Sequence, residues 1–253
     1  MKVYTESHGS GPDIVLVHGW GLHGGIWKSV AKKLADSYRV TIVDLPGYGR
    51  SPLPNGDYTL ETVAELVAEV APNEAAWIGW SLGGMVAMQL ALAHAAHVQR
   101  LILIASTPKF IAGDDWPWGL DANVFHMFEQ NLVQDARATL SRFFALQVHD
   151  LDNAQETLRK LRHQLTERAP EQQALELSLA ILRRSDLRSA LARIQCPTLL
   201  IQGNADNIVT QGTATALQQA LPNATLQIIR NAGHAPFLSH EKEFLNAVDD
   251  FLL

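Results

Sequence analysis

A serine between two glycines is the strongest chemical signal in this 253-residue chain. It lies in the pentad Gly79-Trp80-Ser81-Leu82-Gly83, directly after an apolar run and directly before a helical pattern. A G-x-S-x-G pentad in this context is typical of a nucleophile elbow, in which a tight strand-to-helix turn exposes the serine hydroxyl. The glycines remove side chains that would clash in the turn, and the helix N-terminus favours developing negative charge. Ser81 is therefore the predicted nucleophile.

A serine hydroxyl needs a base, and a histidine in a late loop is the best candidate. His234 follows the last predicted strand and precedes the last predicted helix, so its loop can present an imidazole to the elbow. Four other histidines compete for this role. We expect His18 to brace a glycine-rich loop, and we expect His94 and His97 to cap a helix end. His240 is the fourth competitor.

The base in turn needs an acid that orients it and stabilises the imidazolium. Asp206 lies just after a predicted strand, and the chain order Ser81, Asp206, His234 is the one expected of an elbow serine. Asp44 is the alternative acid, although we expect it to shape a turn. Weaker candidates are Asp114 and Asp115.

Two backbone N–H groups are predicted to stabilise the negative charge of a tetrahedral intermediate. One belongs to Leu82, the residue after the nucleophile. The second is expected in the loop after an early strand, where Gly19-Trp20-Gly21 places the Trp20 N–H. The alternative is that these two glycines only make a turn.

The elements needed to position these residues follow from the hydrophobic pattern. Continuous apolar runs alternate with helical stretches, which predicts βαβ units in a mostly parallel sheet covered by helices on both faces. The predicted strands are 14–18, 38–44, 75–80, 101–106, 198–202 and 225–230. The predicted core helices are 27–35, 60–71, 82–93, 212–220 and 241–253. The fold class is therefore α/β.

The alternation of strands and helices stops in the middle of the chain. Residues 109–193 hold no convincing strand and are predicted to form helices over 125–133, 135–148, 153–168 and 171–184. We therefore predict a core made of residues 1–108 and 194–253, with 109–193 inserted as an all-helical cap. The cap is expected over the carboxyl edge of the sheet, where open α/β sheets bind ligands.

Arginine is concentrated in the predicted cap, which holds 9 of the 13 arginines of the chain. Two successive helices carry the cluster Arg137, Arg142, Arg159, Lys160 and Arg162. One reading is a solvated face. The other is a docking surface for an acidic partner, since guanidinium groups pair with carboxylates and phosphates.

Composition excludes several other classes of function. The net charge of −6 argues against general nucleic-acid binding. The single cysteine, Cys196, precludes an internal disulfide, and no set of His, Cys and Asp has metal-ligand spacing. No cofactor and no metal are expected. The N-terminus lacks an apolar signal-peptide segment and no run is long enough to cross a membrane, so we expect a cytoplasmic protein without membrane contact.

These motifs together resemble those of the α/β hydrolases. The resemblance includes an early His18-Gly19-Trp20-Gly21 and extends over nearly the whole chain outside the cap. A closer resemblance is to the pimeloyl-acyl-carrier-protein methyl ester esterases of biotin synthesis. It is carried by the tryptophan before Ser81 and by the stretches Asp115-Trp116-Pro117, Arg142-Phe143-Phe144-Ala145-Leu146-Gln147 and His234-Ala235-Pro236-Phe237.

This resemblance implies a specific activity. The enzyme would hydrolyse the methyl ester of a pimeloyl chain held on acyl carrier protein, through an acyl-serine and without a cofactor, as a monomer. Residues implied to contact the substrate are Trp20, Ser81, Leu82, Phe143, Phe144, Ala145, Leu146, Gln147 and His234. Arginines implied to dock the carrier are Arg142, Arg159 and Arg137, the last shifted by one position from the family pattern.

Other functions on the same fold stay open at this point. A carbon–carbon bond hydrolase and a general short-chain carboxylesterase would use the same triad. Haloperoxidase-like activity is a further enzymatic alternative. A ligand-binding receptor that keeps the fold without turnover is the alternative from a different class.

Overall fold

The computed structural model describes residues 2–148 and 151–253. Its centre is a seven-stranded sheet in the order β1-β3-β2-β4-β5-β6-β7. Only β1 runs antiparallel to its neighbour, β3, and the other pairs are parallel. The strands are β1 (Thr5–His8), β2 (Asp13–Val17), β3 (Arg39–Val43), β4 (Ala75–Trp80), β5 (Val98–Ile104), β6 (Thr198–Gly203) and β7 (Ala224–Ile229).

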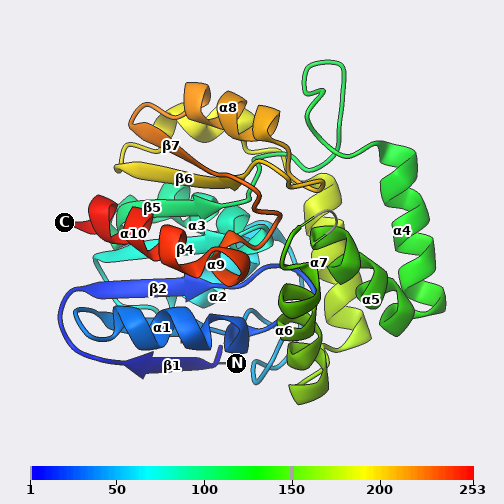
Figure 1. Cartoon of the computed structure of the whole chain (residues 1–253), viewed down its shortest axis with the longest axis horizontal. Helices are drawn as coiled ribbons and strands as arrows, with labels where there is room; N and C mark the ends of the chain where they lie inside the picture. Colours follow the sequence, from blue (N-terminus) through cyan, green and yellow to red (C-terminus); the bar gives the residue numbers. More distant parts are fainter. Residues whose placement is uncertain (1, 149–150) are drawn as a thin grey trace.

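Helices cover both faces of this sheet, with α1 and α10 on one face and α2 and α3 on the other (Figure 1). Since both faces are covered, β4 is buried along its whole length, as its apolar sequence indicates. The helices of the core are α1 (Lys28–Leu34), α2 (Leu60–Ala68), α3 (Leu82–Ala93), α8 (Gln211–Ala220), α9 (Pro236–Ser239) and α10 (Glu241–Leu252). The short 3₁₀ helices are η1 (Gly24–Trp27), η2 (Ala95–His97) and η3 (Arg188–Arg193).

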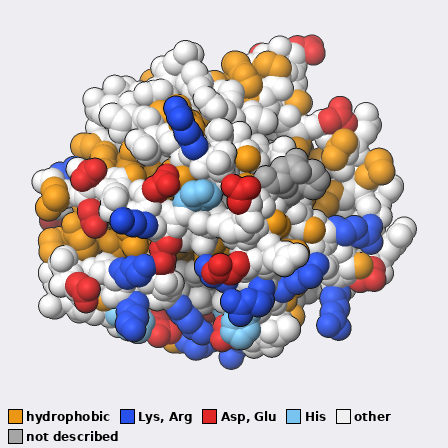
Figure 2. Space-filling view, in the orientation of Figure 1, with side chains coloured by type: hydrophobic (Ala, Val, Ile, Leu, Met, Phe, Trp, Pro, Cys, Tyr) orange, Lys and Arg blue, Asp and Glu red, His pale blue; other side chains and the backbone are white. Residues whose placement is uncertain are grey.

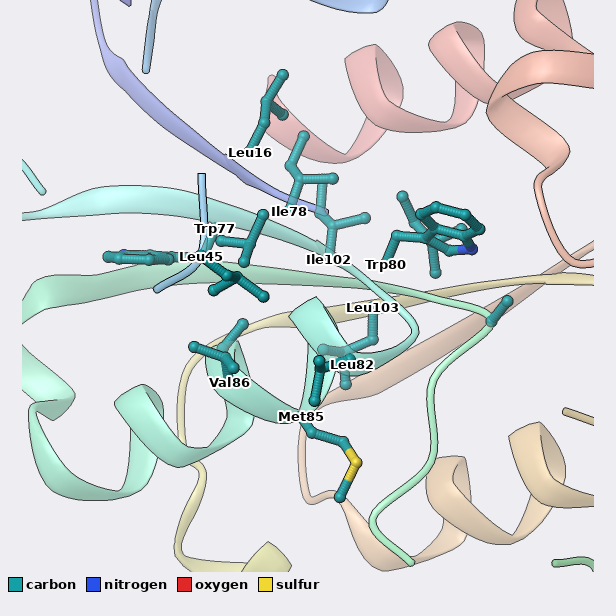
Figure 3. Packing of buried hydrophobic residues seen from close by; sticks show 14 of the residues in the cluster. Leu16, Leu45, Trp77, Ile78, Trp80, Leu82, Met85, Val86, Ile102 and Leu103 are labelled. Carbon is teal, nitrogen blue, oxygen red and sulfur yellow. The ribbon is translucent and has the colours of Figure 1, made fainter. Parts of the chain in front are cut away.

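The strand-to-helix turn at Ser81 lies within the hydrophobic core. Trp77, Ile78 and Trp80 of β4 pack with Leu82 and Val86 of α3 and with neighbouring strands (Figure 3). All five side chains are buried. Tight packing on both sides of the strand-to-helix turn leaves little freedom for Ser81, which lies at that turn.

Four α-helices occupy the described part of the chain between β5 and β6 and gather beyond the carboxyl ends of the strands (Figure 1). They are α4 (Ala122–Gln134), α5 (Ala136–Gln147), α6 (Ala154–Glu167) and α7 (Gln172–Arg184). Asp121 and Asp135 begin the first two, because each carboxylate accepts hydrogen bonds from the free backbone N–H groups of the first turn. We refer to α4–α7 as the cap helices.

The α/β class and the mostly parallel sheet are confirmed, and one strand was absent from the sequence prediction. β1 has the sequence TESH, in which the first two residues are half-buried and the last two are exposed. It pairs with the edge of the sheet through its backbone, so its residues need no apolar pattern.

Candidate active site

The backbone at Ser81 has a conformation that few non-glycine residues adopt, with φ 55° and ψ −117°. Its backbone N–H donates to the Ile104 carbonyl at 2.9 Å, and its carbonyl accepts from Ser106 Oγ at 2.9 Å. Glycine is required at Gly79, because a Cβ there would collide with the Gly83 carbonyl. The core thus holds Ser81 in the strained turn that the pentad predicts.

The structure brings three predicted side chains into one hydrogen-bonded chain. The distance from Ser81 Oγ to His234 Nε2 is 3.0 Å, and the distance from His234 Nδ1 to Asp206 Oδ2 is 2.8 Å. The side chains of His234 and Asp206 are 1% and 0% exposed. A buried carboxylate at Nδ1 leaves Nε2 without a proton, ready to accept one from the serine.

Besides His234, three donors hold Asp206, and they reach both carboxylate oxygens. The backbone N–H groups of Ile208 and Val209 donate to Oδ1 at 2.8 and 3.0 Å, and Gln202 Nε2 donates to Oδ2 at 3.1 Å. Gln202 is a positioning residue that sequence reasoning missed. Its signal is a long polar side chain at the end of the apolar strand β6, where a buried amide needs partners.

The loop that carries His234 is fixed from both the core and the cap. Trp80 Nε1 donates to the His234 carbonyl at 2.7 Å, and the His234 N–H donates to the Gln147 carbonyl at 3.4 Å. Trp80 also packs its ring edge-on against Phe237, with centroids 5.1 Å apart. Trp80 therefore positions the His234 loop as well as filling the core.

The two predicted oxyanion donors are free in the described part of the chain. No described residue accepts a hydrogen bond from the backbone N–H of Trp20 or of Leu82. Gly19 brings the first loop close, because a Cβ at Gly19 would lie 3.2 Å from Ser81 Cβ. Both groups are therefore available to an oxygen beside Ser81.

His18 fixes this loop rather than serving as a base. Its Nδ1 donates to the Gly19 carbonyl at 2.8 Å, and its Nε2 accepts from the Leu45 N–H at 2.9 Å. Complete burial lowers the pKa of His18 to about 4. The imidazole is therefore neutral near pH 7, which matches the acceptor role of Nε2.

The other competing residues make contacts elsewhere. His94 Nε2 lies 2.9 Å from Glu65 Oε2, and His240 Nδ1 lies 2.9 Å from Ser239 Oγ. Asp44 accepts from the Gly24 N–H at 2.6 Å and so shapes its turn, as expected. The ring of His97, in η2, lies tilted against that of His94, with centroids 5.5 Å apart. Asp115 pairs with Arg188 at 2.9 Å, and Asp114 is exposed.

A cavity of about 190 Å³ opens above Ser81 between the core and the cap helices. Its lining is mainly apolar, and it consists of Trp20, Ser81, Phe110, Leu120, Val124, Phe125, Phe128, Asn131, Thr139, Arg142, Phe143, Leu146, Leu179, Leu182 and Ile208. An apolar pocket with few polar groups is the usual form of a site for a small organic ligand. The geometry suits an ester with an aliphatic chain.

Only part of the predicted substrate segment reaches this cavity. Phe143 and Leu146 line it, whereas Phe144, Ala145 and Gln147 do not. The reason is the helical repeat, because a single face of α5 can point toward the cavity. Phe144 lies in the core near Gly21, and the carbonyl of Gln147 holds the His234 loop. Sequence reasoning missed the contribution of α4, whose Phe125, Phe128 and Asn131 follow helical spacing.

Comparison with known proteins assigns the family. The sequence pattern of the alpha/beta hydrolase fold family matches residues 12–241. A pimeloyl-[acyl-carrier protein] methyl ester esterase of Aeromonas hydrophila is 41% identical over 254 residues, with 100% of each chain covered. One of Nitrosomonas europaea is also 41% identical, with 98% of each covered.

The chain belongs to this esterase family. As a member of the pimeloyl-[acyl-carrier protein] methyl ester esterase family, it is a carboxylic ester hydrolase. Solved structures agree on the fold. An esterase from Exiguobacterium antarcticum superposes with a TM-score of 0.88 at 24% identity, covering 98% of this chain and 94% of the other. A bromoperoxidase from Bacillus anthracis gives 0.89 at 25% identity, covering 99% and 95%.

The arginines implicated by this esterase family are all exposed on the cap. Arg142 lines the cavity, while Arg159 lies with Arg162 and His163 along a groove on α6. Arg137 lies on the first turn of α5. Figure 2 shows Lys and Arg side chains, interspersed with acidic ones, over the lower part of one face, where Figure 1 places α1 and α6.

The described residues of this esterase include neither a metal-binding cluster nor a membrane-spanning helix. Over residues 2–148 and 151–253, no group of three or more His, Cys, Asp or Glu side chains is arranged to hold a metal ion. Within the same ranges, no helix has the length and apolar character needed to cross a membrane.

Proposed function

We propose that this chain hydrolyses the methyl ester of pimeloyl-[acyl-carrier protein] and releases methanol and the free pimeloyl carboxylate. The observation that carries the proposal is the Ser81–His234–Asp206 hydrogen-bonded chain at an apolar cavity. The identity of the substrate is inferred from the relatives that match nearly the whole chain, which are pimeloyl-[acyl-carrier protein] methyl ester esterases. The cap, residues 109–193, would close the cavity over the acyl chain.

Catalysis would proceed through an acyl-serine. His234 accepts the Ser81 proton through Nε2 as Oγ attacks the ester carbonyl. The backbone N–H groups of Trp20 and Leu82 donate to the resulting oxyanion. His234 then protonates the departing methoxide, and methanol leaves. A water molecule, deprotonated by His234, attacks the acyl-serine and regenerates the hydroxyl.

Carrier recognition would take place on the cap. Arg142 and Arg159, with Arg137, are exposed cations, and no described acidic side chain forms an ion pair with any of the three. Guanidinium groups without an ion pair among the described residues can bind carboxylates of an acidic carrier at little desolvation cost. Arg142 reaches from this surface to the cavity lining, so it marks the entrance for the acyl chain.

The experiment is a measurement of methanol release from methyl-pimeloyl carrier protein, beside the same acyl ester on a small thiol. Faster turnover on the carrier, lost in Ser81→Ala, supports the proposal. Equal or better turnover of small free esters would instead identify a general carboxylesterase. We further propose a monomeric cytoplasmic enzyme, which light scattering and cell fractionation can test.

A further inference from the structure

Two buried hydroxyl groups join the core to the cap outside the catalytic hydrogen-bonded chain. Tyr48 Oη and Ser178 Oγ are 2.5 Å apart, and both side chains are fully buried. Ser178 lies on α7 and donates its own proton to the Ala174 carbonyl at 2.6 Å, so the Tyr48 hydroxyl is the donor between the two. Burial raises the pKa of Tyr48 well above its ordinary value, against the opposing effect of its hydrogen bonds with Ser178 and the Gly21 backbone. The phenol therefore stays protonated and keeps this donor.

Tyr48 reaches α7 from the turn that follows β3. Its N–H donates to the Leu45 carbonyl at 2.9 Å, which closes the turn. The preceding Gly47 has φ 78°, and a Cβ there would lie 2.6 Å from Ala174 Cβ. The backbone of the turn therefore lies directly against α7, at the place where the two hydroxyl groups meet.

The same helix holds the loop that carries the first predicted oxyanion donor. Trp20 Nε1 donates to the Leu175 carbonyl of α7 at 3.1 Å, and Ser178 Oγ lies 3.2 Å from that carbonyl. Tyr48 also contacts the beginning of the loop, because its ring lies edge-on to that of His18 with centroids 5.3 Å apart. The loop is thus supported by Tyr48 and by α7, and the hydroxyl pair fixes these two supports to each other.

An oxyanion donor is effective only when its N–H lies at the place where the charge forms, and small displacements are costly. We propose that Tyr48 and Ser178 are positioning residues for the oxyanion hole, which hold the Trp20 N–H beside Ser81 through their mutual hydrogen bond. Neither side chain is among the described residues that line the cavity. The inference rests on the proposed function, because it assigns supports to a donor used in that reaction.

The first test removes the hydroxyl groups and measures hydrolysis of the methyl-pimeloyl ester of a small thiol. In Tyr48→Phe, kcat and kcat/KM should fall together by roughly three- to tenfold, since a transition-state interaction is weakened. Ser178→Ala should do the same, and the double variant should lose no more than either single variant, because all three remove one bond. Tyr58→Phe is the matched control, since its hydroxyl donates to the nearby Pro46 carbonyl at 2.8 Å. Its kcat should stay within about twofold of the wild type.

The double variant separates positioning from stability. Ser178→Ala leaves the Tyr48 hydroxyl buried without its acceptor and should melt a few degrees lower than the wild type. Tyr48→Phe with Ser178→Ala removes both polar groups, so its melting temperature should return close to that of the wild type. Its kcat should stay low. Recovery of kcat together with stability would show a purely structural role and overturn the inference.

An alkyl trifluoromethyl ketone examines the oxyanion hole directly. Ser81 Oγ adds to the ketone carbonyl, His234 takes the hydroxyl proton, and the carbonyl oxygen becomes an oxyanion. In Tyr48→Phe, inhibition by the ketone should weaken by the same factor as kcat/KM, whereas the matched alcohol, which forms no adduct, should bind equally well. Unchanged ketone inhibition contradicts only the role of Tyr48 and Ser178. Wild-type enzyme that does not hydrolyse the ester contradicts the proposed function itself.

Discussion

At the scale of single residues, hydrogen bonds and backbone geometry hold the side chains of the site in a single arrangement. Ser81 lies in a strained turn, His234 is oriented by Asp206, and Asp206 is saturated by Gln202 and two backbone N–H groups. Such positioning holds reacting atoms in place before the substrate arrives.

Removal of the Ser81 hydroxyl should abolish activity without changing the stability of the fold. Ser81→Ala is expected to lower kcat by about 10³-fold or more, since the acyl-enzyme cannot form. Thermal unfolding followed by circular dichroism should show a midpoint within a few degrees of the wild type. Wild-type turnover in this variant would remove Ser81 from the mechanism.

Gln202→Leu tests the residue that sequence reasoning missed. Leucine preserves most of the volume but removes the donor to Asp206 Oδ2, so the carboxylate should hold the imidazole less well. We expect kcat to fall by about tenfold, as for other residues that orient a catalytic ligand, with KM nearly unchanged. A steady-state comparison on a small ester measures this. A pure KM effect would contradict a positioning role.

The buried imidazole of His18 predicts a specific dependence of stability on pH. Its pKa is about 4 in the folded chain and about 6.5 when unfolded, so the unfolded state alone takes up a proton between these values. Stability should therefore be fully present above pH 6.5 and fall by about 3 kcal/mol as the pH drops to 4. Denaturant unfolding at several pH values measures this loss.

His18→Gln is the control for that measurement, because its amide can replace both hydrogen bonds without titrating. Its stability curve should be flatter than that of the wild type between pH 6.5 and 4, whatever its absolute stability. Parallel curves would show that another group causes the acid sensitivity.

At the scale of elements, the junction between β4 and α3 decides how close the active-site loops can come. Gly83 lies against the carbonyls of Val17 and His18, at the end of β2. A side chain there would separate α3 from the loop that carries Trp20.

Gly83→Ala should therefore destabilise the protein by about 3 kcal/mol, as an overpacked core does, and should also lower activity. Gly113→Ala is the matched control, because a Cβ at Gly113 makes only ordinary contacts. Chemical denaturation of both variants measures the difference. Equal stability of the two variants would show that the turn can accommodate a Cβ at Gly83.

The order of strands and loops could largely be predicted from the sequence. The elbow, the late histidine and the loop aspartate follow strand ends, and parallel strands bring such loops to one edge. The apolar pattern therefore located the residues that the structure brings together. It could not locate β1, whose pairing uses the backbone. Nor could it show which face of α4 lines the cavity, because α4 has exposed apolar side chains such as Met127 and Val133 as well as buried Phe125.

At the scale of the whole molecule, the cap helices that carry the arginines also line the cavity beside Ser81. Arg142 is both an exposed arginine and a lining residue, and α5 continues from it to the carbonyl that holds the His234 loop. The proposed carrier would therefore dock on an element that also supports the base.

Charge reversal tests this docking. Arg137→Glu with Arg159→Glu, two exposed cations outside the cavity lining, should lower kcat/KM on the carrier-bound ester by about 10- to 100-fold, and should weaken its dependence on ionic strength. Turnover of a small ester should change by less than about threefold, since these side chains are exposed. Lys32→Glu on α1 is the matched control. An equal loss on both substrates would show that the two arginines do not serve carrier recognition.

The contact between the Gln147 carbonyl and the His234 N–H also bears on how such enzymes can diversify. Trp20 makes a second such link, because its indole donates to the Leu175 carbonyl of α7 at 3.1 Å. A helical insertion that contacts the core at both the base and the oxyanion loop is not an interchangeable module. A chimera that exchanged residues 109–193 for those of a distant hydrolase would inherit mismatched supports at both places. An exchange of the helical insertion between hydrolases of this fold should therefore give an active enzyme when the loops around Trp20 and His234 are exchanged with it.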